Sequence, residues 1–263
     1  MKKNYSYHIL DNSPWVIYTS ISVLSIMISN VIYMNRYENR EQYLLISILS
    51  IIINIIGWSI EIIREGRIKG EHTDRVQEGI MKGYILFIIS EICIFGTLFY
   101  TYLYNSLIPD VHIGNIWPPI GIEYIDYKSI PLMNTVLLFF SGITITIAQY
   151  NIKVGDIRES KVYIVYTLIL GILFIILQGI EYKNSINNIQ DSIYSNIFFT
   201  ITGLHGLHVL LGIIYIYIAY IRINEYTDMH HMNYILSAIY YHFVDIIWLF
   251  VYGIIYIWGT GHI

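Results

Sequence analysis

The sequence predicts an all-α membrane protein with seven transmembrane helices. Hydrophobic residues make up 56% of the 263 residues and charged residues only 13%, whereas a soluble domain commonly spends about a quarter of its residues on charge. The apolar residues gather in runs of about 20, the length that an α-helix needs to cross a hydrocarbon core. Strands are not expected, because a membrane barrel alternates apolar and polar positions and runs such as LLISILSIIINIIGW do not.

Seven apolar runs follow one another along the chain, separated by charged or turn-forming segments. We expect them to form a single transmembrane domain over residues 1–263, with spans at 15–33, 43–63, 83–104, 130–150, 162–180, 196–221 and 234–258. If the spans alternate in direction, eleven of the fifteen Lys and Arg residues fall on the side of the N-terminus. Basic residues favour the side on which a membrane protein is made, so we expect the N-terminus inside and the C-terminus outside.

Composition also limits the function. The formal net charge of -4 gives no basic surplus of the kind that binds nucleic acid. Cys93 is the single cysteine, so neither an internal disulfide nor a thiolate metal site is expected. Ile and Tyr, which have AT-rich codons, are abundant, while Ala and Pro are scarce; this bias suggests an organellar gene.

Glu91 lies near the middle of the third predicted span, in ILFIISEICIFGTL. A charge at the bilayer centre costs on the order of 3 kcal/mol or more, so such a residue needs a partner or a purpose. One interpretation is a carboxyl group that is hydrogen-bonded and packed between helices. The other is a carboxyl group that takes part in proton transfer or contacts lipid.

Two histidines, His205 and His208, lie three positions apart in the sixth span. They are about 60° apart around a helix, close enough to share one face and one polar partner. A metal site would need further ligands, and His242 is the only other histidine deep in a span. Gly203 and Gly206 flank the pair and favour close helix packing with interhelical hydrogen bonds instead.

Asp245 lies about halfway along the last span, with His242 one turn earlier on the same face. We expect these two side chains to form a mutual hydrogen bond.

Charged residues crowd the inner segment between the second and third spans. They form either an ordinary solvated loop or a site for lipid phosphates, because basic side chains at a membrane rim attract anionic head groups. Trp58 precedes Arg64 by one and a half turns and is expected near the interface.

Eight stretches together resemble subunit III of the haem-copper cytochrome c oxidases, in the mitochondrial form. They are SPW at 13–15, IREG at 63–66, VQEGIMKGYILFIISE at 76–91, WPPIGIE at 117–123, PLMNTVLLFFSGITIT from 131, LQGIEY at 177–182, TGLHGLHVLLG at 202–212 and HFVDIIWLFVYGIIYIWG from 242. They occur in the family's order and cover most of the chain.

The resemblance implies a fold in which the first two helices are splayed from helices 3–7 and form a V-shaped lipid cleft. It also implies a non-redox core subunit of cytochrome c oxidase, respiratory complex IV, that stabilises catalytic subunit I, holds phospholipids and supports proton uptake during electron transfer from cytochrome c to oxygen. The chain would act in an enzyme only as a subunit of this oxidoreductase. Haem and copper would belong to partner subunits I and II, with bound phospholipid in this chain.

The resemblance also assigns roles to residues, none of them catalytic and none a metal ligand. The lipid-binding positions it implies are Trp58, Arg64, Glu65, His72, Glu91 and Arg222. The intramembrane polar or packing positions are Glu181, His205, His208, His242 and Asp245. The sequence departs from the family where Glu71 precedes His72 in place of a second histidine.

The expected location is the mitochondrial inner membrane, with the N-terminus in the matrix, the C-terminus in the intermembrane space and the gene in the organelle. Expected partners are subunits I and II, accessory subunits and membrane phospholipids. The alternatives are a quinol oxidase subunit III, a stand-alone proton-linked membrane transporter using Glu91 and Asp245, and a haem-binding membrane cytochrome.

Overall fold

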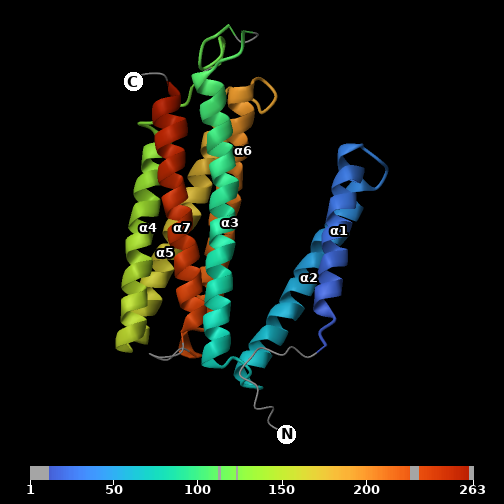
Figure 1. The fold of residues 1–263 in the computed structure, drawn as a ribbon, viewed down its shortest axis with the longest axis vertical. Coiled ribbons are helices and arrows are strands. Elements are labelled where there is room, and N and C mark those ends of the chain that lie inside the picture. The colour runs from blue at the N-terminus through green and yellow to red at the C-terminus, as the bar shows by residue number, and fades with distance from the viewer. Residues whose placement is uncertain (1–11, 112–113, 123, 226–230, 261–263) are drawn as a thin grey trace. The chain divides into compact units, whose positions relative to one another are not determined.

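The structure is a computed structural model that describes residues 12–111, 114–122, 124–225 and 231–260. Its main helices, in chain order, are α1 (Trp15–Met34), α2 (Arg40–Arg67), α3 (Asp74–Leu107), α4 (Ile130–Val154), α5 (Ile157–Asn184), α6 (Ile193–Ile221) and α7 (Met232–Val251) (Figure 1). All seven are long and apolar enough to cross a membrane, and the described residues contain no β-strand. The all-α fold with seven spans is therefore confirmed.

Most of these helices run past the predicted spans. The clearest case is α3, which begins at Asp74 rather than near residue 83, because charge does not end a helix and Glu, Gln and Lys are good helix formers. At the other end of the chain, α7 continues as a π-helix over Tyr252–Ile257 and a 3₁₀ turn over Trp258–Thr260. An apolar run thus measures the segment within the hydrocarbon, not the whole helix.

The chain divides into two compact units, residues 1–82 and 83–263. The predicted splay of the first two helices from the others, and the V-shaped cleft between them, stay predictions.

In the first unit, small polar side chains join α1 to α2. The hydroxyls of Ser29 and Ser47 lie 2.7 Å apart, and those of Ser22 and Ser50 lie 3.2 Å apart. Asn54 also donates to the Ser22 hydroxyl. Lipid provides no hydrophobic drive to bring two apolar helices together, so close packing of small residues and interhelical hydrogen bonds supply the association. The two helices therefore form an antiparallel pair that is joined by hydrogen bonds between these polar side chains.

In the second unit, α4 and α5 form a helical hairpin with a two-residue turn. Gly155 adopts φ +88° at the end of α4, a left-handed conformation that glycine adopts at no steric cost. Asp156 then caps α5, since its side chain accepts a hydrogen bond from the Glu159 amide at 3.1 Å. Between the two helices the Thr144 and Thr167 hydroxyls lie 2.7 Å apart, so the turn and the packing specify the same antiparallel pair.

The core of the second unit is rich in aromatic side chains from α3, α5, α6 and α7. Trp248 is fully buried at its centre, 4.8 Å from the Phe174 ring and 5.9 Å from the Tyr256 ring, measured between centroids. Its indole nitrogen donates to the Thr135 hydroxyl at 3.0 Å. Buried indole N–H groups need such a partner, and this bond fixes α7 against α4.

Gly171 lets α5 pack closely against α6 and α7. A Cβ atom at this position would lie 2.8 Å from the Tyr241 hydroxyl and 3.0 Å from Ile213 Cγ1. We expect Gly171→Ala to lower the free energy of unfolding by about 1 kcal/mol through overpacking, measured by thermal unfolding in mild detergent. Gly179 on the same helix is the control, because nothing lies within 4 Å of its Cβ position. A Gly171→Ala variant as stable as Gly179→Ala would contradict this account.

Candidate functional site

Glu91 on α3 is bonded to His208 on α6. The carboxylate Oε2 lies 2.9 Å from the imidazole Nε2, and the two side chains are 15% and 10% exposed. The Phe95 ring packs edge-on against the imidazole at 5.2 Å between centroids, and the Tyr240 ring lies on it at 6.3 Å. The hydrogen bond between helices that one interpretation of Glu91 expects is therefore present. A role of Glu91 in proton transfer or lipid contact stays a prediction.

The second nitrogen of His208 fixes how this pair can hold its protons. Nδ1 lies 2.7 Å from the Leu204 carbonyl, and a carbonyl can only accept, so Nδ1 carries a hydrogen. Nε2 then either accepts from a protonated Glu91 or, on an imidazolium, donates to the carboxylate. In both arrangements the pair has no net charge, which avoids the cost of a lone charge within the membrane.

His205 turns away from this pair into the core. It is fully buried, and Nε2 lies 3.1 Å from the Val244 carbonyl on α7. Its ring lies 5.0 Å from Trp248 and 5.6 Å from Phe174. The interhelical hydrogen bonding expected of His205 and His208 is therefore confirmed. The two rings do not share a partner, since one bonds α7 and the other bonds α3, because 60° of helix rotation is enough to point them at different neighbours.

The expected hydrogen bond between His242 and Asp245 is also wrong. The His242 Nε2 lies 3.3 Å from the Thr146 hydroxyl on α4. Both carboxylate oxygens of Asp245 are buried without a hydrogen-bond partner among the described residues. Both side chains turn toward α4, where a Cβ atom on Gly142 would lie 2.8 Å from an Asp245 oxygen and 3.8 Å from His242 Nδ1.

Asp245 and His242 line an open groove between α4 and α7. The groove has a volume of about 570 Å³ and mostly apolar walls, and it also contains Thr135, Leu138, Phe139, Gly142, Ile143, Thr146, Ile147, Ile246, Trp248 and Leu249. Phe139 and Ile246 are more than half exposed. Asp245 thus lines an open, mostly apolar groove, while both of its carboxylate oxygens are buried without a bonding partner among the described residues.

Glu181 near the end of α5 belongs to a hydrogen-bonded chain of buried polar groups. Its Oε1 accepts from the Tyr256 hydroxyl and from the Gln178 amide, the latter at 3.2 Å, and Gln178 in turn accepts from Asn134 at 3.2 Å. The predicted packing role of Glu181 fits these contacts. Sequence reasoning did not single out Gln178 or Tyr256, although Gln178 is one turn from Glu181 on the same helix face.

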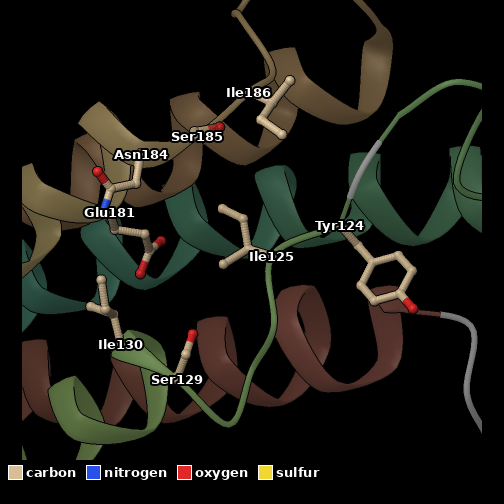
Figure 2. Close-up of a pocket in the computed structure, with 8 residues that line it drawn as sticks. All are labelled: Tyr124, Ile125, Ser129, Ile130, Glu181, Asn184, Ser185 and Ile186. Atoms are coloured by element: carbon tan, nitrogen blue, oxygen red, sulfur yellow. The ribbon is translucent and has the colours of Figure 1, made fainter.

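Glu181 also lines a second pocket, of about 280 Å³, formed by Tyr124, Ile125, Ser129, Ile130, Asn184, Ser185 and Ile186. Figure 2 shows the carboxyl group pointing into the space between α5 and the segment that leads into α4. Glu181 Oε2 has no hydrogen-bond partner among the described residues.

The expected lipid-binding residues fall into both units. Trp58, Arg64 and Glu65 lie on α2, and His72 lies in the segment before α3, where its ring packs over Gly66. Arg64 is exposed and Glu65 is 4% exposed.

Glu91 and Arg222, the latter at the C-cap of α6, belong to the second unit. Joint lipid binding by residues of the two units stays a prediction.

Within the described residues, no group of three or more His, Cys, Asp or Glu side chains could hold a metal ion. In particular, His205 and His208 diverge and His242 faces the groove between α4 and α7. The three intramembrane histidines are therefore not arranged as ligands of one metal.

The fold and these contacts define a multi-span α-helical membrane protein in which intramembrane polar groups bond across helices. At Asp245 and Glu181, carboxylate oxygens have no hydrogen-bond partner among the described residues. A family model described as "Cytochrome c oxidase subunit III" matches residues 5–260. Proteins named "Cytochrome c oxidase subunit 3" from Podospora anserina and Triticum aestivum are each 38% identical to the chain, over 260 and 259 residues. These alignments cover 98% of this chain and 97% and 98% of the relatives.

The chain therefore belongs to the cytochrome c oxidase subunit III family. Membership makes it a subunit of an oxidoreductase complex, respiratory complex IV. The names of the relatives do not favour a quinol oxidase subunit or a stand-alone transporter.

Proposed function

We propose that the chain is a non-redox core subunit that stabilises catalytic subunit I, with haem and copper held by partner subunits I and II. Its place is the mitochondrial inner membrane, with the N-terminus in the matrix and the C-terminus in the intermembrane space, and its gene is organellar. The side-to-side imbalance of basic residues in the sequence supports this orientation.

The observation that carries the scaffold role is the groove between α4 and α7. Asp245 Oδ1 and Oδ2 are buried there without partners. Lipid tails donate no hydrogen bonds, and a polar group left unpaired in hydrocarbon costs several kcal/mol. A transmembrane helix of subunit I would fill the space between the apolar walls of the groove. Rotation of the Asp245 side chain away from Gly142 would let an N–H or O–H group of that helix donate to the carboxyl group.

We also propose that the charged end of α2 holds phospholipid headgroups. Arg64 is exposed, His72 packs over Gly66, and Trp58 is 36% exposed one and a half turns earlier. Basic side chains at a membrane rim attract anionic headgroups, and tryptophan favours the interface. In the second unit, we propose that Glu91 and Arg222 contact lipid. We also propose that the Glu91 carboxyl group supports proton uptake.

Purification through a tag on this chain tests the proposed function. In mild detergent we expect the tagged chain to carry subunits I and II and a reduced-minus-oxidised haem spectrum. A colourless, solitary chain under conditions that keep the oxidase intact would refute the scaffold role.

Variants of Asp245 then test the groove separately. We expect Asp245→Leu to lower the haem recovered per tagged chain severalfold, because the partner's donor is left unpaired, while Asp245→Asn keeps an accepting oxygen and most of the haem. Thr200→Leu, an exposed polar-to-apolar change on α6, is the matched control. Wild-type haem recovery with Asp245→Leu would reject docking through the groove while leaving the subunit role intact.

A further inference from the structure

Asp245 is partly exposed in the groove between α4 and α7, but its carboxyl oxygens are covered. Oδ1 and Oδ2 are both buried. The carboxyl group turns onto α4, where a Cβ atom on Gly142 would lie 2.8 Å from Oδ2 and 3.9 Å from Cγ. The oxygen therefore occupies the space that any side chain at position 142 would need.

The absence of a side chain at Gly142 is what permits this position of the carboxyl group. Gly142 lies in the interior of α4, where glycine is among the least favourable residues for a helix. Its use there has a local explanation, since it leaves room on the helix surface for the carboxyl oxygen of Asp245. In this position the oxygen is kept out of the groove.

His242, the nearest titratable neighbour, does not supply a donor to the carboxyl group. The Thr146 hydroxyl donates to the Gly142 carbonyl at 2.8 Å, so its oxygen accepts from His242 Nε2 at 3.3 Å. A neutral imidazole that carries its hydrogen on Nε2 has none on Nδ1. Nδ1 is the atom that faces Gly142, which explains why His242 and Asp245 do not bond although they lie side by side.

The other donors that line the groove are also in use. The Trp248 indole donates to the Thr135 hydroxyl at 3.0 Å, and that hydroxyl donates to the Pro131 carbonyl at 2.9 Å. The remaining residues of the lining are apolar or glycine. A carboxyl group that turns into the groove can therefore be bonded only by a donor that the groove's own lining does not provide.

The covered and the uncovered positions of the carboxyl group suit different surroundings. Lipid tails donate no hydrogen bonds, so a groove that faces lipid favours the position against Gly142. A partner helix with an N–H or O–H group favours the uncovered position, because the carboxyl group then gains a hydrogen bond. The surroundings of the groove thus decide between the two positions.

We propose that Asp245 has two positions and that Gly142 permits the covered one. The carboxyl group lies against Gly142 while the groove faces lipid, and it turns into the groove when a helix of subunit I docks there. This inference rests on the proposed docking of subunit I in the groove. The affinity of the chain for subunit I is then reduced by the fraction of unbound chains in the covered position.

Gly142→Ala tests the inference because it removes the covered position. The atom in the way is the far end of a side chain, so the carboxyl group should move rather than the helix. The complex is purified through a tag on this chain and diluted into a detergent series, and the haem retained per tagged chain gives the dissociation constant. We expect Gly142→Ala to bind more tightly, by about tenfold if the covered position holds about nine-tenths of the unbound chains.

The same change in an Asp245→Ala background is the matched control. Without the carboxyl group, the nearest atom to the new methyl group would be His242 Nδ1 at 3.8 Å, an ordinary contact distance. Gly142→Ala should then leave the dissociation constant unchanged. Comparing the two backgrounds cancels any general effect of the methyl group on the packing of α4 and α7.

Equal effects of Gly142→Ala in the two backgrounds would overturn the two-position inference. If Asp245→Leu nevertheless loses haem, docking in the groove stands and only this inference fails. Wild-type haem recovery with Asp245→Leu would overturn both.

A second measurement decides the question if Gly142→Ala does not assemble. A membrane-soluble carbodiimide reacts with accessible carboxyl groups, and mass spectrometry locates the product on the detergent-solubilised full chain. We expect more labelling of Asp245 in Gly142→Ala than in wild type. Gly179→Ala, a helix glycine with nothing within 4 Å of its Cβ position, should match wild type. Equal labelling of Asp245 in wild type and Gly142→Ala would refute the covered position.

Discussion

Replacing Trp248 with alanine is expected to lower the free energy of unfolding of the protein by about 3 kcal/mol. The fully buried indole packs on Phe174, His205 and Tyr256 and donates to Thr135. The loss lies at the low end of the range for large aromatic residues, because lipid tails are as apolar as the core and only packing and the hydrogen bond are lost. Thermal unfolding in mild detergent measures the change.

Phe140→Ala is the control for this prediction. Phe140 is 52% exposed on α4, so its removal exchanges one lipid contact for another and should change stability by less than about 1 kcal/mol. Equal effects of Trp248→Ala and Phe140→Ala would show that the aromatic core does not determine the stability of the bundle.

The second large effect is expected at Glu91 and His208. Glu91→Leu leaves His208 Nε2 unpaired between α3 and α6 and should cost about 2 kcal/mol, within the usual penalty for a buried group without a partner. Glu91→Gln keeps an oxygen and an amide hydrogen in reach of the imidazole and should cost less than about 1 kcal/mol. The order of these two variants follows from hydrogen bonding rather than from charge.

A double-mutant cycle measures the bond itself. Glu91→Leu with His208→Leu removes both partners, so the double variant should be more stable than the sum of the single losses predicts. The expected coupling is about 1 to 1.7 kcal/mol, near the upper end measured between transmembrane helices. Additive losses would mean that the 2.9 Å contact contributes nothing to stability.

The sequence predicts the seven spans and the exceptional carboxyl groups better than it predicts the ends of the helices. Each of the seven apolar runs became a helix, because run length and composition determine whether a segment can cross a bilayer. Glu91 and Asp245 were recognised as exceptional because a carboxyl group within an apolar run is costly wherever the chain places it. The ends of the helices were less predictable, as the early start of α3 at Asp74 demonstrates.

Only the tertiary structure decided which partner each polar group takes. The spacing of His205 and His208 predicts interhelical hydrogen bonds, but only the structure shows that the two rings bond Val244 and Glu91 on different helices. His242 and Asp245 were predicted to bond each other, yet both turn toward α4. Spacing along one helix gives the angle between two side chains, but the packing of neighbouring helices determines what lies at the end of each.

The sequence by itself determined the class of the protein, its seven spans and its family, because these depend on local composition and on motifs in order. The pockets at Asp245 and Glu181 depended on the structure, since each combines residues from helices far apart in the chain. Whether a buried oxygen lacks a hydrogen-bond partner depends on the positions of all neighbouring donors, and only the tertiary structure determines those positions.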